Sequence, residues 1–285
     1  MKKLLVWLAL LMMCTSALAE PLPVYPYEWQ GQVKRTYQSD TLKFTVERFE
    51  YEKVCCYVTK IWMADPGRQI RKATGVWEES LAMPADMADQ VEGAVLAVNG
   101  SGYVSPVFPE IPDNYPGESA DYFYTPLGSL TITDGEIFRH LQGVPYYGLT
   151  LQQDGLHMHV GEDIEDILPA NPTQTWSFYE GCPMILDHRS ILDETWSFAK
   201  ARAIRTIIAK MDDNNYVLLT VTNEERHGLS LIQCVDILQT RFDPVWAYDL
   251  DGGPSSALMC REDDGDWKLV FGGKRQDADI MAFTE

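Results

Sequence analysis

Residues 247–259 read Ala-Tyr-Asp-Leu-Asp-Gly-Gly-Pro-Ser-Ser-Ala-Leu-Met. Apolar residues come before and after a polar centre, so the pattern predicts a strand, a turn and a second strand. The two glycines allow backbone conformations that other residues avoid, and they let a ligand approach the main chain. Asp251, Ser255 and Ser256 supply hydrogen-bond acceptors and donors at this turn. The turn is therefore a candidate binding site.

The length and composition fit a folded, exported protein. A chain of 285 residues with 46% hydrophobic content can bury a large core. Lys2 and Lys3 precede an apolar run that ends in Ala17-Leu18-Ala19, which is the pattern of a signal peptide over residues 1–19. Residues 20–35 are expected to form an extended lead-in. No change in composition follows them, so residues 36–285 are expected to form one domain.

The chain is strongly acidic. Residues 1–19 hold two of the 23 Lys and Arg residues and none of the 42 Asp and Glu residues. The mature chain would therefore carry 21 basic and 42 acidic residues, a net charge of -21. Such a charge repels nucleic acid and anionic membrane surfaces. We expect neither as a partner, no integral membrane segment after signal cleavage, and a secreted or cell-envelope location.

Five cysteines follow the predicted signal peptide, and the odd number leaves at least one thiol unpaired. Two of them, Cys55 and Cys56, are adjacent in a stretch that favours a strand. Neighbouring strand residues point to opposite faces, so these two cannot share a disulfide. A core of this size needs no covalent links, and we expect buried apolar cysteines.

The pattern along the chain predicts an α+β fold: a mixed, largely antiparallel β-sheet core with a few helices and one β-α-β crossover near the C-terminus. Alternating runs at 42–49 and 54–63 indicate a hairpin, and Asp-Gly pairs between later runs indicate others. A short helix broken near Pro84 is expected within 80–88. Ser230 is a helix cap between two apolar strands, which is the arrangement of a crossover.

Three further stretches carry polar groups that could reach a ligand. Asn99-Gly100 follows an apolar strand, and Arg205-Thr206 lies inside another. A buried charge needs a partner, so Arg205 predicts either a ligand or a structural pair with a carboxylate. His157 and His159 share a strand face, which is the minimum for a metal site. No third ligand is fixed by spacing, and we interpret both as surface histidines.

The order of these motifs resembles the phosphodiester glycosidase family over about residues 54–283. The family's strongest signature is Asn-Leu-Asp-Gly-Gly-Gly-Ser-Ser after a strand, preceded by an Arg-Thr strand and a helix led by glycine, here Gly228. Asp249 stands where the family usually has Asn, and Pro254 where it has a third Gly. The matching motifs are Asn99-Gly100, residues 178–183, Arg205-Thr206, Asp251, Gly252, Gly253, Ser255 and Ser256.

The resemblance implies cleavage of the bond between a sugar's anomeric carbon and a phosphodiester oxygen. Asp251 would attack that carbon or activate water, and Arg205 would bind the phosphate. The implied ligand is a phosphorylated or phosphodiester-linked carbohydrate, with no cofactor. A divalent ion on Asp249 and Asp251 stays open, although the remaining loop ligands of an Asp-x-Asp-Gly site are missing. The expected substrate-binding residues are Asn99, Gly100, Thr206, Asp249, Gly252, Gly253, Ser255 and Ser256.

Two alternatives compete with this hypothesis. A serine hydrolase would use Ser255 or Ser256 on a Gly-x-Ser-x-Gly elbow, and that pattern is missing. A noncatalytic glycan-binding or cell-surface polysaccharide assembly protein would keep the same pocket without turnover. The exchanges at Asp249 and Pro254 favour this second alternative, because an added carboxylate changes the charge beside Asp251.

Overall fold

The computed structural model describes residues 31–77, 79–103, 124–178, 180–223 and 227–285. The expected signal peptide at 1–19 and most of the lead-in at 20–35 lie outside these residues. The described end of the lead-in enters the first strand, β1 (Gln32–Gln38). Among the described residues, no helix has the length and apolar character needed to cross a membrane.

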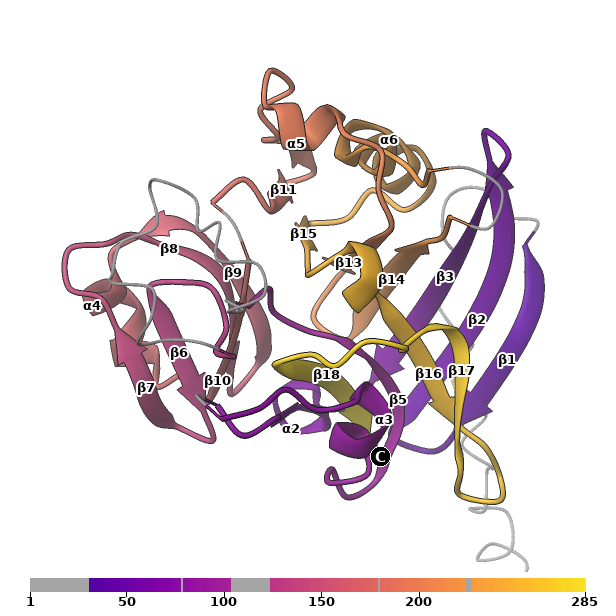
Figure 1. The fold of residues 1–285 in the computed structure, drawn as a ribbon, viewed down its shortest axis with the longest axis horizontal. Coiled ribbons are helices and arrows are strands. Elements are labelled where there is room, and N and C mark those ends of the chain that lie inside the picture. Colours follow the sequence, from indigo (N-terminus) through magenta and orange to yellow (C-terminus); the bar gives the residue numbers. More distant parts are fainter. Residues whose placement is uncertain (1–30, 78, 104–123, 179, 224–226) are drawn as a thin grey trace, which may run out of the picture.

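Strands dominate the fold, and Figure 1 shows them in several groups. The largest sheet has the order β1-β2-β3-β14-β13-β15-β11-β12. Every pairing between its neighbouring strands is antiparallel. Its other strands are β2 (Leu42–Tyr51), β3 (Val54–Met63), β14 (Asn215–Val221), β13 (Arg205–Lys210), β15 (Trp246–Asp249), β11 (Pro183–Leu186) and β12 (Arg189–Ser190).

A second sheet of five strands has the order β17-β16-β5-β18-β4. It comprises β17 (Trp267–Gly272), β16 (Ala257–Arg261), β5 (Ala94–Asn99), β18 (Asp279–Thr284) and β4 (Ile70–Thr74). Two smaller sheets lie to the left of Figure 1. They consist of β10 (Gln174–Ser177), β8 (Tyr146–Gln152) and β9 (Gly155–Glu162), and of β6 (Leu130–Thr133) with β7 (Glu136–His140).

The predicted hairpins form as expected. β2 pairs with β3, and the Asp-Gly turns join β6 to β7, β8 to β9 and β16 to β17. Asp134 and Gly135 both have positive φ, 50° and 81°, which is the conformation that tight hairpin turns require. The α+β prediction, with a largely antiparallel sheet, is thus confirmed.

The predicted crossover joins β14 to β15 through α6 (Leu231–Arg241). Both strands pair antiparallel with β13, which lies between them, so they run parallel to each other. Ser230 caps α6: its hydroxyl accepts a hydrogen bond from the Gln233 amide, and the Gln233 side chain accepts one from the Ser230 amide. This capping box satisfies two amides that a helix start leaves unpaired.

The remaining helices are short: α2 (Pro66–Gln69), α3 (Pro84–Ala88), α4 (Ile164–Ile167) and α5 (Ser197–Lys200). The helix expected within 80–88 begins only at Pro84, so the prediction of a helix broken near this residue is wrong. Proline lacks an amide hydrogen and has a fixed φ, which suits the first turn of a helix rather than its interior. Pro84 therefore starts α3.

Two large clusters of buried apolar side chains cover the two faces of β3. Cys55 belongs to the cluster shared with the five-stranded sheet, and Cys56 belongs to the cluster under α5 and α6. The two neighbouring thiols thus point to opposite faces, as predicted. All five cysteines in the described part of the chain are buried, and no disulfide joins any two of them. They are Cys55, Cys56, Cys182, Cys234 and Cys260.

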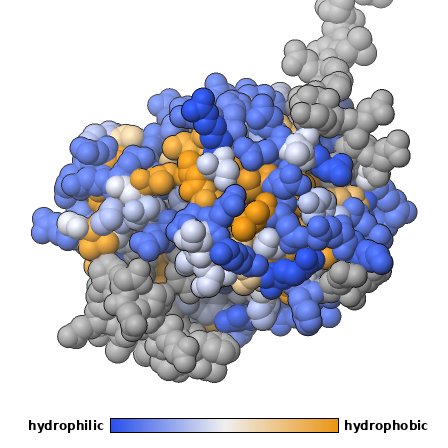
Figure 2. Space-filling view, turned by 90° about the horizontal axis from the view of Figure 1, so that it is seen from above, coloured by the Kyte–Doolittle hydropathy of each residue, from blue (hydrophilic) through white to orange (hydrophobic). Residues whose placement is uncertain are grey.

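The described surface in view in Figure 2 is largely hydrophilic, in keeping with the acidic composition. Figure 2 shows apolar surface gathered in the middle of one face, between polar margins. This view looks from above onto the end of the molecule where Figure 1 places α5 and α6. Ile191, 39% exposed, lies just before α5 in the chain.

Candidate functional site

The decisive stretch forms the predicted strand, turn and strand. β15 ends at Asp249, a short 3-10 turn (η3, Gly253–Ser255) follows, and β16 begins at Ala257. β15 belongs to the eight-stranded sheet and β16 to the five-stranded sheet. We call residues 249–256 the motif loop, and this loop carries the chain from one sheet to the other.

Asn99 fixes the motif loop from the end of β5. Its side-chain amide donates to the Asp251 carbonyl oxygen at 2.7 Å, and its side-chain oxygen accepts from the Ala257 amide at 3.0 Å. The Asp251 amide donates in turn to the Gly100 carbonyl oxygen at 3.0 Å. Asn99 and Gly100 therefore lie at the motif loop, as the order of the motifs suggested. Contact of Asn99 with a sugar hydroxyl stays a prediction.

Two glycines of the motifs lie so close to a neighbouring backbone that a side chain would not fit. A Cβ on Gly252 would lie 2.7 Å from the Ile204 carbonyl oxygen, and one on Gly228 would lie 2.0 Å from the Ala203 carbonyl oxygen. Both contacts are with the segment that leads into β13. The motif loop and the start of α6 thus pack directly against the strand that carries Arg205, and a larger residue would separate them.

Arg205 and Asp249 form a buried pair. The guanidinium Nη1 lies 3.1 Å from the Asp249 carboxylate, and Nη2 donates to the carbonyl oxygens of Phe198 and Ala201. Arg205 is 1% exposed and Asp249 is fully buried. Burial raises the pKa of Asp249 to about 7, against the opposing effect of Arg205. The sequence had left open a structural carboxylate partner for Arg205, and the structure supplies it.

Asp251, only two residues further on, is half-buried. Its carboxylate accepts the Gly252 amide at 2.8 Å. Burial raises the pKa of Asp251 to about 6, while the Ser255 hydroxyl, the Gly252 amide and Arg275 act against this rise. A carboxyl with this pKa is largely ionised at neutral pH and can still accept a proton, which suits a nucleophile or general base.

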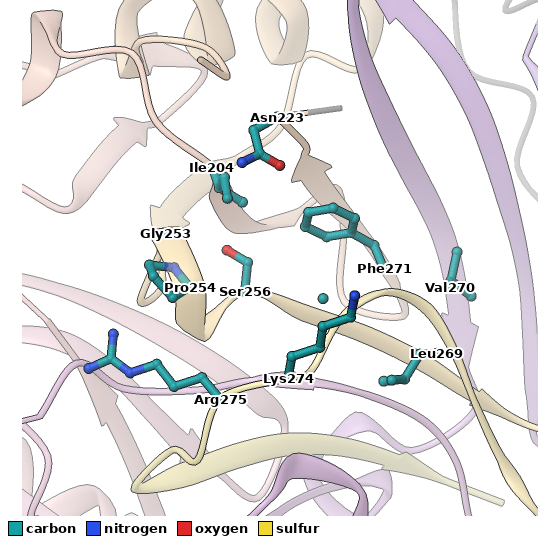
Figure 3. Close-up of a pocket in the computed structure, with 11 residues that line it drawn as sticks. Ile204, Asn223, Gly253, Pro254, Ser256, Leu269, Val270, Phe271, Lys274 and Arg275 are labelled. Carbon is teal, nitrogen blue, oxygen red and sulfur yellow. The ribbon is translucent and has the colours of Figure 1, made fainter. Parts of the chain in front are cut away.

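A pocket of about 590 Å³ opens beside the motif loop and has the size of a small-molecule site. Figure 3 shows Gly253, Pro254 and Ser256 facing it from the loop, with Lys274 and Arg275 below. Its other lining residues are Ile204, Asn223, Leu269, Val270, Phe271 and Gly272. Apolar side chains thus form one wall, and two cations stand at the edge.

Sequence reasoning missed Lys274 and Arg275. They follow Gly272 and Gly273, both with positive φ, in the connection between β17 and β18. A Cβ on Gly272 would lie 1.7 Å from the Ser256 carbonyl oxygen, so this connection packs onto the motif loop. The guanidinium of Arg275 lies 5.1 Å from the centre of the Tyr103 ring. A Gly-Gly-Lys-Arg run after a strand was the available signal.

The backbone amides of the motif loop are already engaged. Gly252 donates to the Asp251 carboxylate and Gly253 to the Ile204 carbonyl oxygen, while Ser255 and Ser256 donate within the 3-10 turn. These amides therefore donate to acceptors within the protein itself. The hydroxyls of Thr206 and Ser256 are buried and have no hydrogen-bond partner among the described residues, and the buried Ser255 hydroxyl interacts with Asp251 and Asp277.

The histidines of β9 lie in local contacts. His157 lies 2.7 Å from Asp154, and His159 contacts Thr150 and Glu162. Within the described ranges, no three His, Cys, Asp or Glu side chains are grouped in a way that could hold a metal ion. Asp249, one of the two carboxylates considered for a divalent ion, pairs with Arg205 instead.

Comparison with known proteins identifies the family. The model of the phosphodiester glycosidase family, NAGPA, matches residues 92–284. Since this is more than half of the chain, the protein belongs to the phosphodiester glycosidase family. Membership supports a phosphodiester glycosidase-type function. A comparison with curated protein sequences gave no match.

Two solved structures share the fold. The zebrafish N-acetylglucosamine-1-phosphodiester alpha-N-acetylglucosaminidase catalytic domain, auto-inhibited by its pro-peptide, superposes with a TM-score of 0.64 at 16% identity, over 90% of this chain and 87% of that one. A hypothetical protein from Synechocystis superposes with a TM-score of 0.55 at 14% identity, over 89% and 64%. These likenesses confirm the architecture.

Proposed function

We propose that the protein is an exported hydrolase that cleaves a sugar-1-phosphodiester at the anomeric carbon, as in N-acetylglucosamine-1-phosphodiester substrates. The observation that carries this proposal is that the motif loop, which holds Asp251, supplies Gly253, Pro254 and Ser256 to a pocket edged by two cations. One of these cations, Arg275, acts on Asp251. A carboxylate suits the developing positive charge on the sugar, and cations suit the phosphate. The family match gives the reaction class.

Asp251 takes the place beside the anomeric carbon in this proposal. Its carboxylate either attacks that carbon or removes a proton from a water molecule, and its pKa of about 6 keeps it ionised at neutral pH. Asn99 holds the Asp251 carbonyl and the first amide of β16, which fixes the backbone on both sides of this carboxylate. Preorganisation of this kind lowers the cost of reaching the transition state.

Arg275 is the group that we assign to the phosphate. It lines the pocket and lies close enough to Asp251 to lower the pKa of that carboxyl. A guanidinium can hold two phosphate oxygens at once, and Lys274 adds a second positive charge. Arg205, the residue first expected at the phosphate, is buried against Asp249. Its contacts favour a positioning role, and direct phosphate contact stays a prediction.

The test is a screen of sugar-1-phosphodiesters with identification of both products, run on the wild type and on Asp251→Asn. Release of free sugar by the wild type, lost in the variant, is the expected result. A wild type that binds these compounds without turnover would instead identify a glycan-binding protein. In that case Asp249→Asn, which restores the family's usual residue, is the variant to examine for regained activity.

A further inference from the structure

Asp277 stands out among the carboxyls around the motif loop. It is 1% exposed, and neither of its carboxyl oxygens has a hydrogen-bond partner among the described residues. Its main chain is fixed, because its amide donates to the Ala82 carbonyl oxygen at 2.9 Å and its carbonyl oxygen accepts the Ala82 amide at 3.1 Å. The side chain is therefore held in the interior by a rigid backbone.

Two neighbouring buried carboxyls, Asp249 and Asp279, each lie beside a cation. Asp249 pairs with Arg205 at 3.1 Å, and Asp279 lies 3.4 Å from Lys72. Asp279 also accepts the amide and the hydroxyl of Ser101, at 2.6 and 2.9 Å. These contacts compensate the negative charges of Asp249 and Asp279.

Asp277 has no such partner of its own. Arg275 is the cation that acts on it, and the same arginine acts on Asp251. The Ser255 hydroxyl, 1% exposed, likewise interacts with both carboxyls. Asp251 and Asp277 thus share one arginine and one hydroxyl. Two negative charges in this buried place would be poorly compensated, since burial of an unpaired ion is costly.

We propose that Asp277 is the proton-holding partner of Asp251: Asp251 is the ionised member of the pair, and Asp277 is a neutral carboxylic acid that can donate a hydrogen bond toward the Ser255 hydroxyl. This inference rests on the proposed function only in the role given to Asp251. Asp277 itself is buried and acts through Ser255 and Asp251, so it is a positioning residue.

The electrostatics agree with this division. Burial raises the pKa of Asp277 well above its usual value, and the charge of Asp251 raises it further; Ser255 and Arg275 act in the other direction. Asp279 contributes a smaller upward effect. Tyr103 also faces this cluster, and burial raises its pKa to about 12. Asp251 therefore loses its proton first, and its charge then retains the proton on Asp277.

The pair predicts a specific pH dependence of stability. A carboxyl whose pKa is raised by folding binds its proton more tightly in the folded state, so it stabilises at low pH and this stability is lost as pH rises through its folded pKa. Asp277→Asn removes that loss. We expect the Tm difference between this variant and the wild type to grow in favour of the variant from pH 4 to pH 9.

The coupling to Asp251 is tested in the same experiment. In Asp251→Asn the neighbouring charge is gone, so the folded-state pKa of Asp277 should be lower, and the fall in Tm should be smaller and end at a lower pH than in the wild type. The exposed Asp264→Asn is the control for a general loss of surface charge. An Asp277→Asn variant whose Tm follows the wild type at every pH would overturn the proposal, whether or not the protein hydrolyses any substrate.

Kinetics separate the positioning role from a merely structural one. Ionisation of Asp277 should lower the wild-type kcat at alkaline pH, and Asp277→Asn, which imitates the neutral acid, should remove this alkaline fall. Tyr103→Phe, which removes the other acid facing the cluster, should leave that fall in place. If the alkaline limb persists in Asp277→Asn and disappears in Tyr103→Phe, the proton is held by the tyrosine and the proposal fails.

Discussion

Asp249 and Asp251 are separated by one residue and lie in different environments. Asp249 is fully buried against Arg205. Asp251 is half-buried, accepts its neighbour's amide and interacts with Arg275 at the edge of a pocket. The strand ends between the two residues, so the chain turns before the second carboxylate. The pair of Asp249 and Arg205 thus joins two strands of the sheet, and Asp251 with Arg275 is the pair that we propose for the chemistry.

The difference shows why a motif cannot be read as a set of equivalent residues. Arg205 donates hydrogen bonds to Asp249 and to two backbone carbonyls. Its guanidinium carbon also lies 4.3 Å from the centre of the Phe198 ring. Arg275 lies on a connection between strands and lines the pocket. Burial and position in the fold, rather than residue type, separate the structural arginine from the proposed substrate-binding one.

The largest expected effect separates the two aspartates. Asp251→Asn should lower kcat on a cleaved phosphodiester by roughly 10²- to 10⁴-fold, the usual contribution of a positioned carboxylate in proton transfer. Asp249→Asn should lower it far less, because Asp249 is fully buried against Arg205. Steady-state kinetics on both variants, with near-ultraviolet circular dichroism to confirm folding, measures the contrast. Equal losses in the two variants would remove the distinction.

The sequence predicted the architecture well because its signals are local. Asp-Gly turns between alternating runs specify antiparallel hairpins, and Ser230 followed by Gln233 specifies the start of α6. The motif loop was also recognisable, since its glycines, aspartate and serines are adjacent in the chain. The helix at 80–88 was misjudged only at its start, where Pro84 begins the helix.

The remaining features of the site depend on contacts between distant segments. Arg205 and Asp249 are 44 positions apart, and nothing in the sequence selects this carboxylate from the many available. Lys274, Arg275 and Asp277 occur in a polar stretch that looks like a solvated turn. The predicted hairpin pairs Gly272 with Ala257 and so brings that stretch near the motif loop, and the contact of Gly272 with the Ser256 carbonyl oxygen fixes its position there. Local patterns do not report such packing.

A second prediction concerns the structural pair. Arg205→Met should lower the free energy of unfolding by about 3–5 kcal/mol at pH 8, because it leaves the buried Asp249 carboxylate without its cation. The cost should be smaller at pH 6, since the pKa of Asp249 is raised to about 7 and further protonation relieves the charge. Urea unfolding at the two pH values gives the comparison.

Arg275→Met is the matched control for that measurement. Arg275 is half-buried, and its loss should change the free energy of unfolding by less than about 1 kcal/mol. A large destabilisation by Arg275→Met with a negligible one by Arg205→Met would reverse the roles assigned to the two arginines. A different result would show that Arg205 binds the phosphate. In that case the Arg205→Lys variant would fold normally and would have a raised KM for phosphodiesters but not for an uncharged glycoside.

A third prediction concerns the phosphate. Arg275→Met should reduce kcat/KM for a sugar-1-phosphodiester by roughly 10- to 100-fold, the effect of losing a hydrogen-bonded charge at a ligand. Arg275→Lys should recover part of this loss, because the charge remains and the paired donors do not. Lys274→Met should have a smaller effect, since its ammonium is exposed. An uncharged glycoside substrate should be insensitive to all three changes.

The smallest expected effect concerns how Asp249 and Asp251 influence each other's pKa. The pKa of Asp251 is about 6, so kcat/KM should rise with pH through this value as the carboxylate forms. Asp249 has the higher pKa, about 7, and the charge of Asp251 contributes to its rise. Arg205, 3.1 Å from Asp249, compensates the charge of Asp249 and weakens its effect on Asp251. Asp249→Asn should therefore move the acidic limb of kcat/KM by less than about half a pH unit.

The reverse exchange should have a visible effect. In Asp251→Asn the charge that raises the pKa of Asp249 is absent, so Asp249 should ionise at lower pH than in the wild type. Carbon NMR of labelled aspartate carboxyls reports this directly and needs no substrate. If Asp249→Asn shifts the acidic limb by a full unit while Asp251→Asn leaves the Asp249 titration unchanged, Asp249 is the carboxyl that loses its proton first. The structural and chemical roles of the two aspartates would then have to be exchanged.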